Sequence, residues 1–249
     1  MAVQRIKLLG VPVDILPPQD METEILELLA KPGTKQIVFM SVWDLLKARR
    51  KNDYAQCVRE ADLVLPVSKS ILRGARFLKK EVPVRYNQFT AVISILSVLE
   101  NHYKSLYLLG GRKKALMAAE RNVRSTFPGL QIVGRYVGYY PKAVENDIVQ
   151  AIFKASPSLA LVSDGIREKD CWSYTRRNRF SSSIFLYYRD GIGIFSERIK
   201  RVKEKTFERG LEIWSEILHN PLKLFLIFPY IYYIVCLLWY KLFKRNDAD

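Results

Sequence analysis

Histidine and cysteine are scarce in this chain of 249 residues. The histidines are His102 and His219, and the three cysteines, Cys57, Cys171 and Cys236, lie far apart. No two cysteines have the CxxC spacing of a zinc site, and their odd number argues against a disulfide framework. We therefore expect a reducing compartment and no metal site. The histidines fall at a predicted helix end and beside a hydrophobic segment, so a Ser-His-Asp or Cys-His mechanism fits poorly.

Negative charge is also in short supply. There are 25 acidic residues against 40 lysines and arginines, which gives a formal net charge of +15. So basic a surface suits phosphorylated substrates, anionic lipid headgroups or nucleic acid, although solubility alone also explains it. No helix-turn-helix, RNP or zinc pattern accompanies the charge, so we expect no nucleic-acid partner. The apolar stretch at the N-terminus is too short for a secretory signal.

Short apolar runs alternate with helix-like segments, which predicts parallel strands with right-handed crossovers. Near-continuous apolar strands indicate that both faces of the sheet are covered. We predict a Rossmann-like α/β fold, mostly parallel, with helices on both faces and a C-terminal helical, membrane-associated appendage. The expected strands are Gln36–Ser41, Asp62–Pro66, Ser105–Gly111, Leu130–Tyr136, Leu159–Ser163 and Ser183–Tyr188, and the expected helices are Trp43–Glu60, Lys69–Lys79, Phe89–Tyr103, Arg112–Thr126, Lys142–Ala155 and Glu168–Arg179.

Composition changes twice near the C-terminus, which divides the chain into an α/β domain (1–191), a basic helical appendage (192–219) and a hydrophobic membrane segment with a basic tail (220–249). Ile192 to Leu218 reads as a charged helix. Two interpretations remain open for it: a basic face that meets phosphates, or a solvated helix with i,i+4 ion pairs.

The run from Leu224 to Tyr240 carries no charge over 17 residues. As a helix it would be about 25 Å long, near the lower limit for crossing a bilayer. Its aromatic residues favour a membrane interface, and Pro229 would kink a helix. Three outcomes stay open: a short transmembrane helix, a kinked segment in one leaflet, or a C-terminal core helix. In the first two, residues 222–243 attach the protein to the membrane.

Glycines follow two of the expected strands, at the edge where α/β sheets bind ligands. Gly110 and Gly111 precede Arg112 and Lys113 at a helix start, which favours binding of a diphosphate. A tight strand-to-helix turn is the alternative explanation. After a later strand come further residues expected to rim the same cleft or, alternatively, to form a solvated helix cap: Asp164, Gly165, Arg167, Lys169 and Asp170.

Several segments match one family in order and spacing. They are FMSVWDLLKA (Phe39–Ala48), ADLVLPVS (Ala61–Ser68), YLLGG (Tyr107–Gly111), FPGLQIVGRYVGYY (Phe127–Tyr140), SDGIREKDCW (Ser163–Trp172), GLEI (Gly210–Ile213) and Asn220-Pro221. From about Val11 to Leu224 the chain resembles the WecG/TagA/CpsF glycosyltransferases, glycosyltransferase family 26.

The resemblance implies transfer of a sugar, N-acetylmannosamine or another hexose, from a UDP-sugar to a polyprenyl-diphosphate-linked acceptor in cell-envelope polysaccharide synthesis. It places the protein on the cytoplasmic face of the bacterial inner membrane, attached by the C-terminal segment. No cofactor or metal is implied. Self-association, or association with other glycosyltransferases, is a further expectation from the family.

The chain departs from the family where the chemistry is expected. The family's proposed general base is the aspartate of LPDG, and here Val67 and Ser68 stand in place of its aspartate and glycine. Because valine cannot accept a proton, the catalytic residues of this chain are unknown. Ser41 stands where the first motif commonly has asparagine. Other replaced positions are Gln88–Thr90 (family GSD or GTD), Arg167–Asp170 (PKQE) and Gly191–Ile194 (AFDF).

Two interpretations follow from these departures. The chain is an active, divergent hexosyltransferase that uses a displaced base or substrate assistance, or it is a catalytically inactive pseudo-glycosyltransferase that acts as a binding or scaffold partner in the same pathway. Retained donor binding favours the first, and its loss favours the second.

Overall fold

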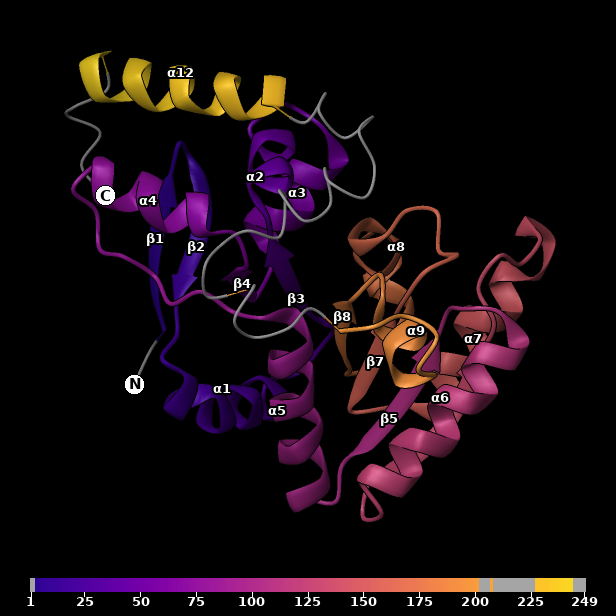
Figure 1. Ribbon diagram of the computed structural model, residues 1–249. Coiled ribbons are helices and arrows are strands. Elements are labelled where there is room, and N and C mark those ends of the chain that lie inside the picture. Colours follow the sequence, from indigo (N-terminus) through magenta and orange to yellow (C-terminus); the bar gives the residue numbers. More distant parts are fainter. Residues whose placement is uncertain (1–2, 202–206, 208–226, 244–249) are drawn as a thin grey trace.

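The computed structural model describes residues 3–201, 207 and 227–243. Its centre is a sheet of six parallel strands in the order β4-β3-β8-β7-β5-β6 (Figure 1). The strands are β3 (Lys35–Met40), β4 (Leu63–Pro66), β5 (Ser105–Leu109), β6 (Gln131–Tyr136), β7 (Leu159–Val162) and β8 (Ile184–Tyr187). The structure thus confirms the predicted α/β class and all six predicted strands.

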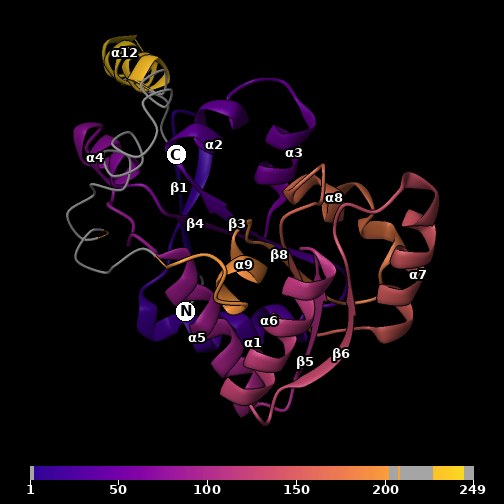
Figure 2. The ribbon, with the colours of Figure 1, turned by 45° about the vertical axis from the view of Figure 1, so that its right-hand side comes forward.

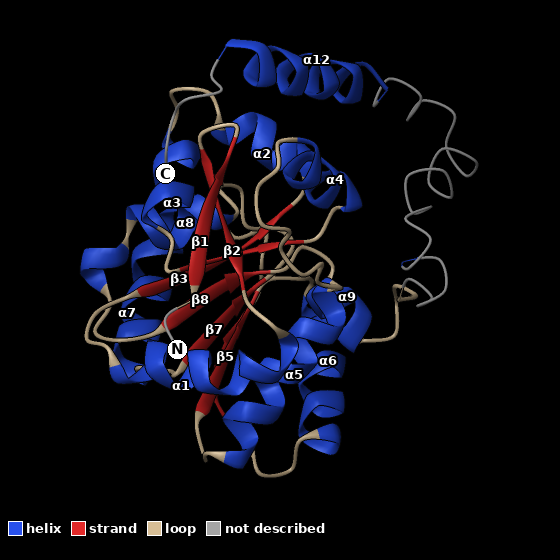
Figure 3. Ribbon diagram, turned by 90° about the vertical axis from the view of Figure 1, so that its left-hand side faces the viewer, coloured by secondary structure: helices blue, strands red, loops and turns tan. Residues whose placement is uncertain are grey.

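Alternate residues of each strand face opposite layers, as the pleat requires. Leu106 and Leu108 of β5 enter the core beneath α1 (Met21–Ala30), α5 (Gln88–Asn101), α6 (Lys113–Thr126) and α9 (Gly191–Phe195). Tyr107 and Leu109 enter the opposite core beneath α7 (Glu145–Ala155) and α8 (Asp170–Thr175). Figures 2 and 3 show helices on both faces of the sheet.

An antiparallel hairpin precedes the sheet and is absent from the sequence prediction. It consists of β1 (Gln4–Leu8) and β2 (Val11–Ile15), and Gly10 in its turn has a φ of +81°. Its apolar residues share a core with α2 (Val42–Ala48), α3 (Asp53–Glu60), α4 (Lys69–Phe77) and α12 (Ile227–Phe243). Asp14 of the hairpin is 1% exposed and accepts a hydrogen bond from the Val64 N–H of β4 at 2.6 Å.

The helix predicted over Trp43–Glu60 is two helices, α2 and α3. Ser41 caps α2 with a capping box to Asp44, and Asn52 caps α3 through a 2.8 Å bond from the Ala55 N–H. Because Asn52 accepts from the start of a new helix, the chain turns between Ala48 and Asp53. The predicted helix over Glu168–Arg179 is likewise shorter, comprising α8 and a 3-10 turn, η3 (Arg177–Arg179). A second such turn, η2 (Lys142–Val144), precedes α7.

The predicted helix from Ile192 onward is interrupted. α9 ends at Phe195, and residues 196–201 are turn, bend and irregular structure. Ile192 and Phe195 belong to the core beneath the sheet. The remainder of the expected charged helix lies outside the described residues, except Phe207. The division of the chain into three domains stays a prediction.

The C-terminal helix α12 lies across α4 and α2 at one end of the molecule (Figure 1). Tyr233, Cys236 and Leu237 are buried in the core shared with the β1–β2 hairpin. Among the described residues, no helix has the length and apolar character needed to cross a bilayer. The inner face of α12 packs as a core helix does.

Candidate functional site

The connections of the sheet reverse direction between β5 and β7. The chain leaves β5 through α6 toward β6 at one edge, whereas it leaves β7 through α8 toward β8 on the other side. In open α/β sheets a ligand binds outside the carboxyl ends of the strands at such a switch point. The residues that follow β5 and β7, Gly110–Lys113 and Ser163–Gly165, therefore mark the candidate site.

The Gly110–Gly111 turn is packed against the loop after β7. A Cβ atom on Gly110 would lie 2.9 Å from the Ser163 backbone carbon, and one on Gly111 would lie 2.5 Å from Ile192 Cγ2. The Gly110 N–H donates to Tyr136 O and the Gly111 N–H to Asp164 O, both at 2.9 Å. These two amides are thus occupied by protein carbonyls. Anion binding at this corner would instead use the first N–H groups of α6, which has no side-chain cap, and the exposed Arg112 and Lys113.

Loops after β6 and β7 are also joined. Tyr139 N–H donates to Gly165 O at 3.0 Å, and its hydroxyl donates to Asp164 Oδ2 at 3.0 Å. This hydrogen bond to the Asp164 carboxylate raises the pKa of Tyr139. The Arg112 guanidinium lies 5.8 Å from the Tyr139 ring centroid. Asp164, Arg112 and an exposed aromatic ring are therefore neighbours at the switch point.

Ser163 fixes the backbone behind these groups. It is fully buried, and its hydroxyl donates to Arg189 O at 2.8 Å and accepts from the Ile192 N–H at 3.1 Å. The loop after β8 is thereby tied to the end of β7. Because α9 begins in that loop and packs on α6, the glycine turn is held from both sides.

A cavity of about 150 Å³ lies beside the loop after β7, and Gly165 and Arg167 line it together with Tyr140, Lys142, Glu145, Glu168 and Trp172. Its two acidic residues share the Arg176 guanidinium: Glu145 accepts from Trp172 Nε1 at 2.9 Å and pairs with Arg176 at 3.1 Å, and Arg176 also pairs with Glu168 at 2.7 Å. Lys142, Arg167 and Arg176 thus outnumber the two carboxylates. Arg167 is exposed and has no ion pair within the described part of the chain. The cavity therefore presents net positive charge.

Lys169 and Asp170 differ in their exposure to solvent. Lys169 is exposed and precedes α8, whereas Asp170 is only 8% exposed, so its carboxyl is not on the rim where we expected it. Burial, and to a lesser extent the Asp44 charge, raise the pKa of Asp170 to about 8. The nearby Tyr54 hydroxyl is buried without a hydrogen-bond partner among the described residues.

Ser41, Val67 and Ser68 lie together at the ends of β3 and β4. The Val67 N–H donates to Met40 O at 2.9 Å, and the Val42 N–H donates to Ser68 Oγ at 3.2 Å. The Val67 side chain is half-buried and packs against the core. Ser41 is the N-cap of α2, and its hydroxyl is hydrogen-bonded to Asp44 in the capping box.

Arg85 connects this end of the sheet to the C-terminal part of the chain. Its Nε donates to Val67 O at 2.9 Å, its Nη1 donates to Phe207 O at 2.5 Å, and its guanidinium lies 3.8 Å from the Phe207 ring centroid. Residue 207 is thus held beside position 67. No group of three or more metal-ligating side chains occurs among the described residues.

Comparison with known proteins places these observations in a family. The model of the glycosyl transferase WecG/TagA/CpsF family matches residues 6–247. The chain therefore belongs to this family, as the motifs predicted.

Two curated relatives carry the same name, N-acetylglucosaminyldiphosphoundecaprenol N-acetyl-beta-D-mannosaminyltransferase. The protein of Bacillus spizizenii is 21% identical over 175 residues, which cover 70% of this chain and 67% of the relative. That of Bacillus subtilis is 20% identical over 174 residues, with the same shares covered.

Sequence reasoning missed Tyr139, Ser163 and Arg85 as parts of the site. Tyr139 stands in the quoted FPGLQIVGRYVGYY segment, so the motif carried a signal, but its contact with Asp164 crosses 25 residues of sequence. The bond from Ser163 to Arg189 and that from Arg85 to Val67 join separate loops. The apolar periodicity of the sequence does not indicate hydrogen bonds between separate loops.

Proposed function

We propose that the protein transfers N-acetylmannosamine, or another hexose, from a UDP-sugar to a polyprenyl-diphosphate-linked acceptor in cell-envelope polysaccharide synthesis. The family match over residues 6–247 carries the proposal, and the names of the two relatives supply the sugar and the lipid. The site agrees in chemistry: both substrates are diphosphates, and Arg112, Lys113 and Arg167 are exposed cations near the switch point. Cationic groups there would stabilise the departing UDP.

The donor diphosphate would lie at the N-terminus of α6. Arg112 and Lys113 stand at that end, where the helix dipole also favours an anion. The test is calorimetric titration of the full chain with UDP and UDP-N-acetylmannosamine. Charge reversal by Arg112→Glu with Lys113→Glu should weaken UDP binding about tenfold or more. The matched control is Arg121→Glu, an exposed residue farther along α6, which should leave the affinity unchanged.

A second candidate function is a pseudo-glycosyltransferase that binds or scaffolds partners in the same pathway. Two observations favour it: position 67 is a valine packed on the core, and the Gly110 and Gly111 amides are occupied by carbonyls. It predicts no sugar transfer to N-acetylglucosaminyl-diphospho-undecaprenol. Transfer of labelled sugar by the purified chain would reject this candidate, and absence of UDP binding at millimolar nucleotide would reject the enzyme.

We also propose that the protein works at the cytoplasmic face of the bacterial inner membrane, attached by α12. The outward residues of this helix are exposed and apolar, including Val235 at 54%, Leu242 at 73% and Phe243 at 71% exposure. Such a surface inserts at the headgroup boundary of one leaflet. Basic residues of α4, among them Arg73 and Arg76, are exposed and would add attraction to anionic lipid.

A further inference from the structure

A cavity of about 250 Å³ lies between α4 and α12, away from the switch point. Four of its lining residues, Ser70, Arg73, Gly74 and Phe77, follow helical spacing along one face of α4. The facing residues of α12 follow the same spacing and are Tyr230, Tyr233, Ile234, Leu237 and Leu238. The two helices thus form the walls of an elongated groove.

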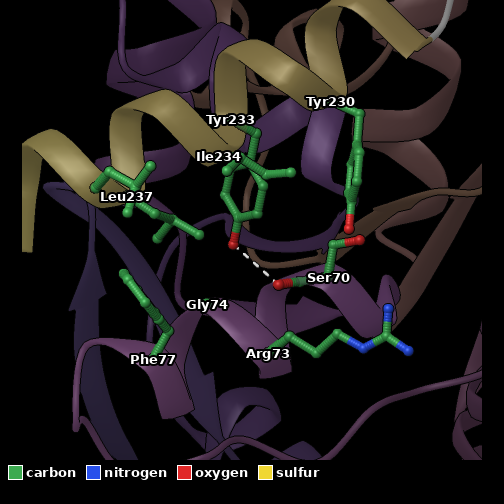
Figure 4. Close-up of a pocket in the computed structure, with 9 residues that line it drawn as sticks. Ser70, Arg73, Gly74, Phe77, Tyr230, Tyr233, Ile234 and Leu237 are labelled. Atoms are coloured by element: carbon green, nitrogen blue, oxygen red, sulfur yellow. Dashed lines mark hydrogen bonds between the residues drawn. The ribbon is translucent and has the colours of Figure 1, made fainter.

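At Gly74, α4 is in close contact with the Tyr233 side chain of α12. A Cβ atom there would lie 2.0 Å from the Tyr233 hydroxyl oxygen, so the Tyr233 side chain can take this position only because residue 74 is glycine. The Tyr233 hydroxyl donates to Ser70 O at 2.9 Å. Figure 4 shows this bond spanning from α12 to α4, with open space beside it.

The two ends of the groove differ in chemistry. Phe77 and Leu237 lie at one end, and Ser70, Tyr230 and the Arg73 guanidinium lie toward the other (Figure 4). Arg73 is exposed and has no ion-pair partner within the described ranges. An apolar chain with an anionic end matches this polarity, because the guanidinium can bind a phosphate while the apolar end excludes water.

The end of the groove that holds Ser70 and Arg73 is the N-terminal end of α4, the helix that follows β4. α4 begins directly after Ser68, so Ser70 is three residues from Val67, the position of the family's proposed base. From Ser70 to Phe77 the groove runs about 10 Å along the helix. A ligand whose diphosphate lies near Ser70 and Arg73 would present its sugar to the carboxyl edge of β4.

We propose that the groove between α4 and α12 binds a prenyl diphosphate, with the diphosphate at Arg73 and the first prenyl units between Phe77, Ile234 and Leu238. The volume suffices for a short stretch of hydrocarbon, since an apolar cavity of about 150 Å³ already holds a benzene ring. The inference rests on the proposed function for its choice of a diphosphate lipid. It adds where on this chain the lipid end of the acceptor lies.

The test is equilibrium binding of radiolabelled farnesyl diphosphate to the full chain, with two matched pairs of variants. Arg73→Glu and Arg76→Glu reverse the same charge on the same helix, but only Arg73 lines the groove. Ile234→Trp and Val235→Trp enlarge neighbouring exposed residues of α12, and only Ile234 lines it. We expect the first member of each pair to weaken binding about tenfold or more and the second to leave it within about twofold.

Absence of farnesyl diphosphate binding, or equal effects within both pairs, would overturn the proposal. So would full competition by dihexanoylphosphatidylglycerol, because the groove would then be a general phospholipid site. Circular dichroism of each variant checks folding, and the two pairs act independently. UDP affinity is measured on the same samples. If the chain binds farnesyl diphosphate but not UDP, the proposed lipid site stands and the proposed transferase activity is rejected.

Discussion

At the scale of single residues, Asp14 joins the N-terminal hairpin to the sheet. Its carboxylate accepts from Arg5 Nε at 2.6 Å and Arg5 Nη2 at 2.8 Å, and from the Val64 N–H at 2.6 Å. Replacing Asp14 with alanine would leave the Val64 amide unpaired and would leave Arg5 bonded only to the Ala61 and Asp62 carbonyls. We expect Asp14→Ala to lower the free energy of unfolding by about 1–3 kcal/mol, measured by urea denaturation.

An exposed pair serves as the control for this prediction. Arg177 and Glu60 lie 2.8 Å apart with side chains 41% and 42% exposed. Because solvent screens such pairs, Glu60→Gln should change stability by at most about 1 kcal/mol. Similar losses for both variants would show that burial does not distinguish the two ion pairs.

Asp170 makes stability depend on pH. Its pKa is raised to about 8 in the folded protein, chiefly by burial, from an ordinary value near 4 in the unfolded chain. Between these values the folded state keeps the proton and the unfolded state has lost it. The Asp170 carboxyl therefore makes its full contribution to the free energy of unfolding below about pH 4, and this contribution is lost progressively as the pH rises to about 8.

Asp170→Asn removes this titration while keeping the shape of the side chain. We expect the asparagine variant to gain stability relative to the parent protein as the pH is raised from 4 to 8, with no further relative gain above that. Urea denaturation of both proteins across this range measures the difference. A constant difference at all pH values would mean that the Asp170 carboxyl titrates normally in the folded state.

At the scale of elements, α12 packs on α4 because residue 74 has no side chain. In Gly74→Ala the new Cβ would meet the Tyr233 hydroxyl, so α12 should move away even though alanine favours the helix. We expect faster hydrogen exchange of the α12 amides, measured by mass spectrometry. Adding Tyr233→Phe removes the clashing oxygen and should restore part of the protection. Unchanged exchange in Gly74→Ala would show that the two helices tolerate a wider separation.

Prediction of the elements succeeded where the core imposes a strong pattern. The strands that begin at Ser105 and Leu159 are covered on both faces, and continuous apolar runs identify them. The hairpin of β1 and β2 was not predicted because its apolar residues alternate with polar residues and Pro12 and do not form the continuous apolar run that identified the other strands. Asp14 is tolerated inside only because Arg5 and the Val64 amide satisfy it, and these partners are set by tertiary structure.

At the scale of the whole molecule, apolar surface gathers on α12 and positive charge on the adjacent α4. We expect the full chain to sediment with vesicles that contain anionic lipid, and salt to weaken the binding. Leu242→Glu with Phe243→Glu should abolish sedimentation without unfolding, since both side chains are largely exposed. The control is Tyr103→Glu, which replaces a 79% exposed aromatic residue at the end of α5. Equal loss in the control would point to net charge alone.

The sequence by itself determined the family, the α/β class and the strands, because these depend on local apolar pattern and on motif order. It also placed Gly110, Gly111 and Gly165 at strand ends. Only the tertiary structure decided that the Gly110 and Gly111 amides bond to the Tyr136 and Asp164 carbonyls, that Asp170 is buried, and that α12 packs on α4. The physical reason is that these features join segments far apart in the chain, and a side chain's partners and solvent exposure exist only once those segments have packed.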